Sequence, residues 1–176
     1  MSNDNDDPTA RPPSYYDSEP YLKNKNFIPH ILTVAANGYA WHASKLYIDT
    51  LNIGLNETRV LSILYEYNEL QAWQICDILS INKATVSQSL KTLENRGLVN
   101  IERRREGRFI TPTDSSKIVH RQIVRMARSR EEILLDGFSE KEREQFNDFL
   151  ERFYRNLPRA IDYANANFVD HNDSDV

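Results

Sequence analysis

The chain has 176 residues with 26 acidic and 22 basic side chains, so its formal net charge is −4. That length suits one compact domain, or a small module packed on a second element. The single cysteine, Cys76, has no partner for an intramolecular disulfide, and the histidines share no metal-ligand spacing. No apolar run reaches membrane-spanning length, and the acidic start is unlike a signal peptide. We expect a cytoplasmic protein that is not an enzyme and uses no cofactor, metal or membrane.

Positive charge is concentrated in the middle of the chain. Residues 82–130 carry 12 basic and 4 acidic side chains, a net charge of +8. Residues 1–81 carry 5 basic and 10 acidic side chains, and residues 131–176 carry 5 and 12. A basic segment inside an acidic protein is typical of polyanion binding through one face. The alternative is a charged helix that is simply solvated.

Four helices are predicted in the first half of the chain. Residues 1–26 hold several prolines among Asp, Asn and Ser and predict a disordered arm. Apolar residues then recur at three- and four-residue spacing across 27–54, which predicts a first helix, and Asn56 can cap a second. Shorter helices are expected at about 72–79 and 83–96.

A β-hairpin is predicted next, because the apolar period falls from about 3.6 residues to two. Leu98–Ile101 and Arg108–Thr111 read as its strands. Gly107 supplies a permissive turn residue, and Pro112 ends the hairpin because it has no N–H to donate.

Two long helices complete the chain. Asp114 can cap a fifth helix, and Ser139 with Glu142 can form a capping box at the start of a sixth. Pro158 is expected to kink or restart that helix. Residues 169–176 form an acidic tail.

The two short helices and the turn between them predict a helix-turn-helix. Val86, Leu90 and Leu93 recur at a spacing that turns them toward the core together. The outward positions are small, amide-bearing or cationic, as expected for a helix that reads base edges in the major groove. These candidate DNA-binding residues are Asn82, Lys83, Thr85, Ser87, Gln88 and Lys91. Asn82 can also cap the helix predicted at about 83–96.

Arginines cluster at the tip of the predicted hairpin. Four guanidinium groups within six residues repel one another, but facing phosphates or a narrow minor groove they gain counterion release. The alternative is an ordinary solvated turn. The candidate DNA contacts here are Arg103, Arg104, Arg105 and Arg108.

Four stretches of the middle of the chain form a recognisable pattern: I-C-D-I-L at 75–79, N-K-A-T-V-S at 82–87, L-K-T-L-E-N-R-G-L-V at 90–99 and I-T-P-T at 110–113. With these stretches, residues 55–117 resemble the winged helix-turn-helix of the MarR family of bacterial transcription regulators, and the flanking helices match the family's plan. One departure is in the hairpin, where Glu106-Gly107-Arg108 replaces the family's Asp-x-Arg on a longer loop.

This resemblance implies a mainly α fold whose winged lobe carries a two- to three-stranded β wing. The lobe would span residues 55–113, and residues 27–54 and 114–168 would form the dimerisation helices. The expected function is that of a homodimeric repressor on a pseudo-palindromic operator in double-stranded DNA. The alternative from another class is a winged-helix adaptor that binds proteins and lacks specific DNA binding.

The resemblance also implies a site for a small aromatic or phenolic acid, such as a hydroxycinnamate or benzoate. A cation beside aromatic walls suits an aryl carboxylate. For each candidate, ordinary packing or ion pairing is the competing interpretation. The candidates are Tyr39, Trp41, His42 and Arg59.

Overall fold

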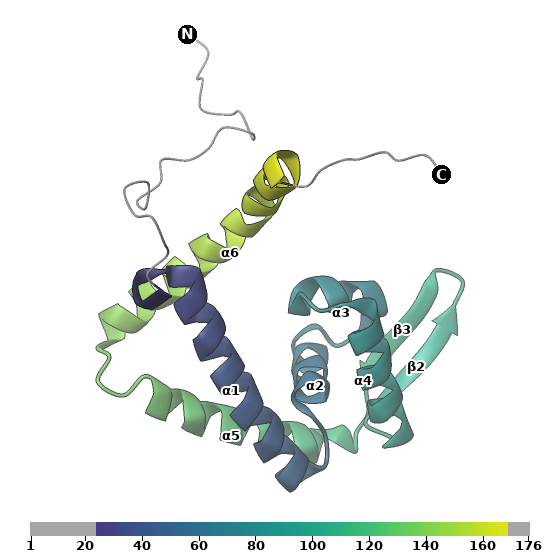
Figure 1. The fold of residues 1–176 in the computed structure, drawn as a ribbon. Helices are drawn as coiled ribbons and strands as arrows, with labels where there is room; N and C mark the ends of the chain where they lie inside the picture. Colours follow the sequence, from purple (N-terminus) through teal and green to yellow (C-terminus); the bar gives the residue numbers. More distant parts are fainter. Residues whose placement is uncertain (1–23, 169–176) are drawn as a thin grey trace, which may run out of the picture. The chain divides into compact units, whose positions relative to one another are not determined.

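The computed structural model describes residues 24–168 (Figure 1). Most of the predicted arm, residues 1–23, and the predicted tail, residues 169–176, lie outside the described residues. The described chain falls into two compact units, Asn24–Leu134 and the segment that begins at Leu135. Within residues 24–168 no helix is long and apolar enough to cross a bilayer.

The first unit contains five α-helices and a small antiparallel sheet in the order β1-β3-β2. The second unit contains the long helix α6. This architecture confirms the predicted fold class, and it adds β1 as a third strand beside the hairpin. The elements are α1 (Ile28–Leu51), α2 (Leu55–Tyr67), β1 (Leu70–Gln71), α3 (Ala72–Leu79), α4 (Lys83–Asn95), β2 (Val99–Arg104), β3 (Gly107–Pro112), α5 (Ser116–Leu134) and α6 (Glu140–Phe168), preceded by a 3-10 turn at Asn24–Asn26.

Two details of the predicted elements are wrong. Helix α2 begins at Leu55 and its N-cap is Gly54, so Asn56 lies inside the first turn. Helix α5 begins at Ser116, two residues beyond the predicted cap. Its start is fixed by the buried Ser116 hydroxyl, which donates to the carbonyl of Thr113 over 2.7 Å. The restart that was one of the two outcomes expected at Pro158 does not occur, because α6 continues through the proline with the loss of one helical hydrogen bond.

Other predicted ends are confirmed. Ser139 and Glu142 form the capping box of α6: the Ser139 amide donates to the Glu142 carboxylate over 2.8 Å, and the Glu142 amide donates to the Ser139 hydroxyl over 3.3 Å. The Ser139 hydroxyl also donates to the Glu142 carboxylate over 2.7 Å, and this hydrogen bond, together with that from the Ser139 amide, lowers the pKa of Glu142. The hairpin strands run further than predicted, leaving only Arg105 and Glu106 in the turn.

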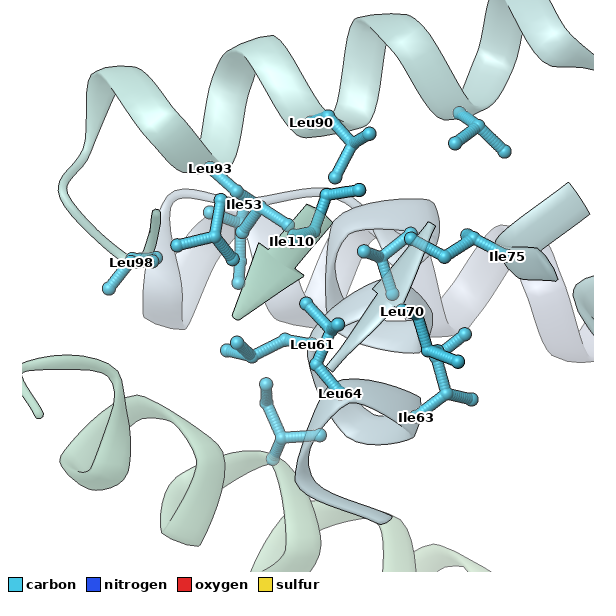
Figure 2. Close-up of a cluster of buried hydrophobic side chains, with 14 of the residues drawn as sticks. Ile53, Leu61, Ile63, Leu64, Leu70, Ile75, Leu90, Leu93, Leu98 and Ile110 are labelled. Atoms are coloured by element: carbon cyan, nitrogen blue, oxygen red, sulfur yellow. The ribbon is translucent and has the colours of Figure 1, made fainter. Parts of the chain in front are cut away.

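The core lies between α2, α3, α4 and the sheet (Figure 2). From α4, Leu90 and Leu93 point into it and are 4 % and 0 % exposed, and Val86 is 1 % exposed, as their spacing predicts. Ile75 of α3 and Ile110 of β3 are completely buried beside them. Because these side chains belong to one cluster, the orientation of α4 is fixed by the same packing that holds the sheet.

Candidate nucleic-acid interface

The turn between α3 and α4 is held by backbone and side-chain hydrogen bonds. Ser80 adopts a left-handed conformation (φ 50°), and the amide of Ile81 donates to the carbonyl of Cys76 over 3.1 Å. Asn82 then caps α4, as predicted, because its Oδ1 accepts from the Thr85 amide over 2.8 Å and from the Thr85 hydroxyl over 3.0 Å. The cap therefore fixes the position of the first turn of α4, whose amide groups lie next to solvent.

One face of α4 is exposed and carries no acid. Lys83, Ser87 and Lys91 follow one another at four-residue spacing, and Gln88 lies beside them, with all four side chains exposed. Thr85 is half-buried and its hydroxyl is used in the cap. No acidic residue precedes Glu94 on this helix. Hydroxyl, amide and ammonium groups on one solvent-facing surface can donate to base edges and to phosphates.

The arginines of the hairpin divide between its two faces. Arg103 on β2 lies directly opposite Arg108 on β3, and Arg104 lies opposite Gly107. Because successive residues of a strand alternate between faces, Arg103 and Arg108 share one face and Arg104 projects from the other. Arg105 lies in the turn, and Gly107, the first residue of β3 after it, adopts φ 136°.

Arg103 and Arg108 form an unneutralised pair. Both are exposed, and neither is within ion-pair distance of an acid in the described part of the chain. Like charges directly opposite each other destabilise a β-ladder. The pair therefore costs the hairpin stability, and an anion between the two strands would relieve the repulsion.

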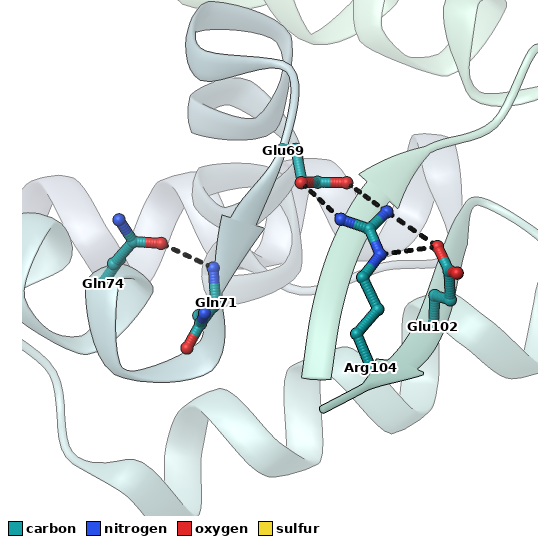
Figure 3. Close-up of polar contacts among 5 residues, drawn as sticks. All are labelled: Glu69, Gln71, Gln74, Glu102 and Arg104. Atoms are coloured by element: carbon teal, nitrogen blue, oxygen red, sulfur yellow. Dashed lines mark hydrogen bonds and ion pairs between the residues drawn. The ribbon is translucent and has the colours of Figure 1, made fainter. Parts of the chain in front are cut away.

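Arg104 forms ion pairs with two carboxylates (Figure 3), whereas no ion pair of the other three hairpin arginines is found among residues 24–168. Its Nη1 and Nη2 donate to the two carboxylate oxygens of Glu69 over 2.9 and 2.8 Å, and its Nε and Nη2 donate to Glu102 over 3.0 and 2.7 Å. Its guanidinium also lies 4.4 Å from the ring centre of Phe109. The hydrogen bonds to Glu69 and Glu102 raise the pKa of Arg104, and the hydrogen bond and charge of Arg104 lower the pKa of Glu102.

Two residues that hold this surface were not identified from the sequence. Glu69 lies directly before β1, and no pattern pairs it with a residue 35 positions away. Arg96, at the end of α4, donates from Nη1 to the carbonyls of Leu51 and Asn52, both over 2.7 Å. Arg96 thereby joins the end of α4 to the end of α1, where helix carbonyls lack intrahelical partners. The only sign of this contact in the sequence was a basic residue at the end of a predicted helix.

The structure brings two of the four predicted effector residues together. Tyr39 and Arg59 line a cavity of about 560 Å³ between α1, α2 and α5, a volume suited to a small organic ligand. Trp41 is 76 % exposed, His42 is also exposed, and neither lines the cavity. The reason is the helical period, since both lie off the stripe of α1 that contains Tyr39 and Tyr47.

The cavity wall is electropositive and aromatic. Arg59 donates from Nη2 to the carbonyl of Leu79 over 2.9 Å, and both residues line the cavity. Arg130 of α5 stacks over the ring of Tyr39 at 4.3 Å. Burial raises the pKa of Tyr47, which also lines the cavity. The wall thus offers phenol groups and a cation whose hydrogen bond holds the last turn of α3.

Comparison with known proteins gives three kinds of match. Residues 58–100 match a family model that is described as "Bacterial regulatory protein, arsR family". The uncharacterized HTH-type transcriptional regulator YybA of Bacillus subtilis (strain 168) is 23% identical over 104 residues, covering 57% of this chain and 69% of YybA. The MarR/EmrR family transcriptional regulator of Acinetobacter sp. ADP1 superposes with a TM-score of 0.73 at 23% identity, covering 78% of this chain and 99% of that chain.

A putative MarR family transcriptional regulator from Listeria monocytogenes, solved with 26mer DNA, superposes with a TM-score of 0.71. It is 21% identical and covers 86% of this chain and 99% of its own. The fold and the surfaces described above define a winged helix-turn-helix protein. More narrowly, its fold is that of a MarR-type transcriptional regulator, which confirms the resemblance found in the sequence.

Proposed function

We propose that this protein is a homodimeric transcriptional regulator that binds double-stranded DNA sequence-specifically through α4 and the hairpin β2–β3. The observation that carries the proposal is the acid-free exposed face of α4 beside an unneutralised arginine pair, on a winged-helix fold. The similar Listeria protein was solved with DNA, which supports the same use of the fold here.

In this proposal α4 enters the major groove. Gln88 and Ser87 contact base edges, Lys83 and Lys91 contact phosphates, and Asn82 and Thr85 fix the first turn of the helix beside the sugar-phosphate backbone. The N-terminus of α4 adds partial positive charge and free N–H groups next to a phosphate. The side chains at these positions would then set the base sequence that is read.

The hairpin supplies sequence-independent affinity. Arg103 and Arg108 flank one strand of the duplex and Arg105 extends from the turn. Each phosphate that an arginine neutralises releases condensed counterions, so affinity falls as salt rises. The mutual repulsion of Arg103 and Arg108 is relieved when a phosphate lies between them, which makes the bound state more favourable than the free one.

Homodimerisation accounts for the apolar surface of the long helices. On α6 the apolar side chains recur at three- and four-residue spacing, and none is buried. Helices α1 and α5 also carry exposed apolar side chains, including Trp41 and Ile133, each 76 % exposed. Apolar surface on this scale marks a protein interface. The exposed apolar residues of α6 are Phe146, Phe149, Leu150, Tyr154, Leu157, Ile161 and Phe168.

We further propose that the protein is a repressor, released when a small aromatic or phenolic acid occupies the cavity at Tyr39 and Arg59. The carboxylate would bind the Arg59 guanidinium in competition with the Leu79 carbonyl. Because Leu79 is the last residue of α3, weakening that hydrogen bond frees the turn that positions α4. The ligand would then favour a dimer whose α4 helices no longer fit the groove.

The DNA proposal is tested by selecting bound duplexes from a randomised library with the full chain. An enriched inverted repeat is the expected result, with binding that weakens by about 0.9 log units per log salt for each phosphate neutralised. Gln88→Ala should relax the selected sequence, whereas Arg105→Gln should weaken all duplexes alike. A library that shows no enrichment, together with a weak salt slope, would favour the adaptor function.

The effector proposal is tested by thermal unfolding in the presence of benzoate and a hydroxycinnamate. A ligand that binds the native state raises the unfolding temperature, and at the same concentration it should weaken binding to the selected duplex. Arg59→Gln should abolish both effects, whereas Lys45→Gln, which removes an exposed charge from α1, should leave both in place. Equal duplex affinity with and without each acid would contradict this part of the proposal.

A further inference from the structure

A single side chain joins all three strands of the sheet. The strand order is β1-β3-β2, and Arg104 on β2 extends across Phe109 of the central strand to the carboxylate of Glu69, which immediately precedes β1 (Figure 3). The contact to Glu69 is bidentate, with N–O distances of 2.9 and 2.8 Å. Bidentate arginine–carboxylate pairs are the geometrically specific ones, and the planar guanidinium also stacks on the Phe109 ring.

The strand that Arg104 reaches is also the start of α3. Gln71, the last residue of β1, accepts a hydrogen bond from Gln74 of α3 in a capping box and a 2.9 Å hydrogen bond from the Trp73 indole. The Oε1 of Gln71 lies 3.3 Å from where a Cβ of Gly107 would stand, so the start of β3 packs closely against it. Whatever fixes the hairpin against β1 therefore also fixes it relative to the helix-turn-helix.

We propose that Arg104 is a positioning residue. Glu102 and Phe109 fix its guanidinium within the hairpin, and its contact with Glu69 holds the hairpin against β1, so that Arg103 and Arg108 reach the phosphates while Arg104 does not. This inference rests on the proposed DNA binding and deepens it. Of the four arginines, Arg104 holds the hairpin in place, and the other three face the duplex.

Two physical arguments support this division. First, β1 has only two residues in register with β3, Leu70 with Ile110 and Gln71 with Phe109, so the backbone ladder alone holds the hairpin weakly. Second, Arg104 with its two carboxylates carries a local charge of −1. A cluster of that sign repels a phosphate backbone, and strand alternation turns it away from the face that bears Arg103 and Arg108.

The competing mechanism is that a phosphate displaces Glu69 and takes Arg104 for itself. The two mechanisms give opposite signs for one substitution. If Arg104 is a phosphate contact, Glu69→Gln frees it and removes a negative charge, so DNA binding tightens. If Arg104 holds the hairpin, Glu69→Gln weakens binding even though it makes the protein less acidic.

The experiment measures binding of the full chain to a fluorescent duplex across a salt series. For Glu69→Gln we expect weaker binding and a salt slope lower by about 1.8, the loss of two phosphate contacts at about 0.9 each. The matched control is Glu106→Gln, which removes an acid from the turn outside the cluster and should tighten binding. Arg104→Lys keeps the charge but loses the bidentate contact, and it should behave like Glu69→Gln. Binding as tight as that of the Glu106→Gln control, or tighter, would overturn the inference.

Hydrogen exchange of the free protein provides a readout that needs no DNA. Amides of β3 from Gly107 to Ile110 should exchange faster in Glu69→Gln and Arg104→Lys than in the unmodified chain, while the helical amides of α4 keep their protection. Unchanged exchange in β3 would overturn the inference. Failure of the unmodified protein to bind any duplex would instead contradict the proposed function, and the exchange result would still decide whether Arg104 holds the hairpin.

Discussion

The guanidinium of Arg59 donates a 2.9 Å hydrogen bond to the carbonyl of Leu79, which links the first half of α2 to the last residue of α3. The final carbonyls of a helix have no intrahelical partner, and a cation at that end also interacts favourably with the helix dipole. Leu79 is followed at once by the turn into α4. A side chain in the wall of the cavity thus holds the segment that orients the exposed face of α4.

We expect Arg59→Met to lower the free energy of unfolding by about 1–3 kcal/mol, because it leaves the half-buried Leu79 carbonyl without its charged donor. Urea unfolding followed by circular dichroism measures this change. Lys45→Met removes a cation from the exposed side of α1 and should change the free energy by less than about 0.5 kcal/mol. Equal stability of the two variants would show that the hydrogen bond contributes nothing to the fold.

Arg103→Gln should separate stability from binding. Removing one of the two opposed charges relieves the repulsion with Arg108, so the free energy of unfolding should rise slightly, by about 0.5 kcal/mol. Duplex affinity should fall, with a salt slope lower by about 0.9. Arg128→Gln makes the same change in net charge on an exposed site of α5 and should leave the slope unaltered. A parallel loss in both variants would mean that net charge alone, and not the wing, governs binding.

The helical part of the fold could be predicted from the sequence because its signals are local. The spacing of Val86, Leu90 and Leu93 fixes which face of α4 is buried, and the short side chain of Asn82 before that run marks its cap. Asn56 failed as a cap because Ile53, 2 % exposed, is drawn into the core and the helix begins one residue after Gly54. Tertiary burial there outweighed a side-chain preference.

The contacts that organise the candidate site could not be predicted, because they join residues far apart in the sequence. The pairs Arg104 with Glu69 and Arg96 with Leu51 span 35 and 45 positions. Nothing in the run of hairpin arginines distinguishes Arg104 from its neighbours. The distinction arises from strand register, which places Arg104 on the face of Phe109 and Arg103 on the other.

Acid should destabilise the contact between α2 and α5. His120 stacks on Tyr65 with ring centres 3.9 Å apart, and burial lowers the pKa of His120 below the ordinary value of 6.5. The unfolded chain therefore binds the proton more readily, and stability is lost as pH falls below 6.5 toward the folded pKa. His120→Phe keeps an aromatic stack and removes the titration. Its unfolding free energy should depend less on pH in this interval, and an unchanged pH profile would exclude His120 as the cause.

If the protein dimerises through α6, a charge introduced into the apolar row of this helix should weaken the dimer. A charge introduced on the opposite side of the helix should not. Ile161 is 56 % exposed in a single chain and belongs to the apolar row of α6, so Ile161→Lys should cost a monomer little. In a dimer the new charge would be buried without a partner, which shifts the equilibrium toward monomer at micromolar concentration. Asp162→Lys, on the side of α6 opposite the apolar row, should remain dimeric. Sedimentation equilibrium measures both variants, and identical masses would argue that the apolar row serves another contact.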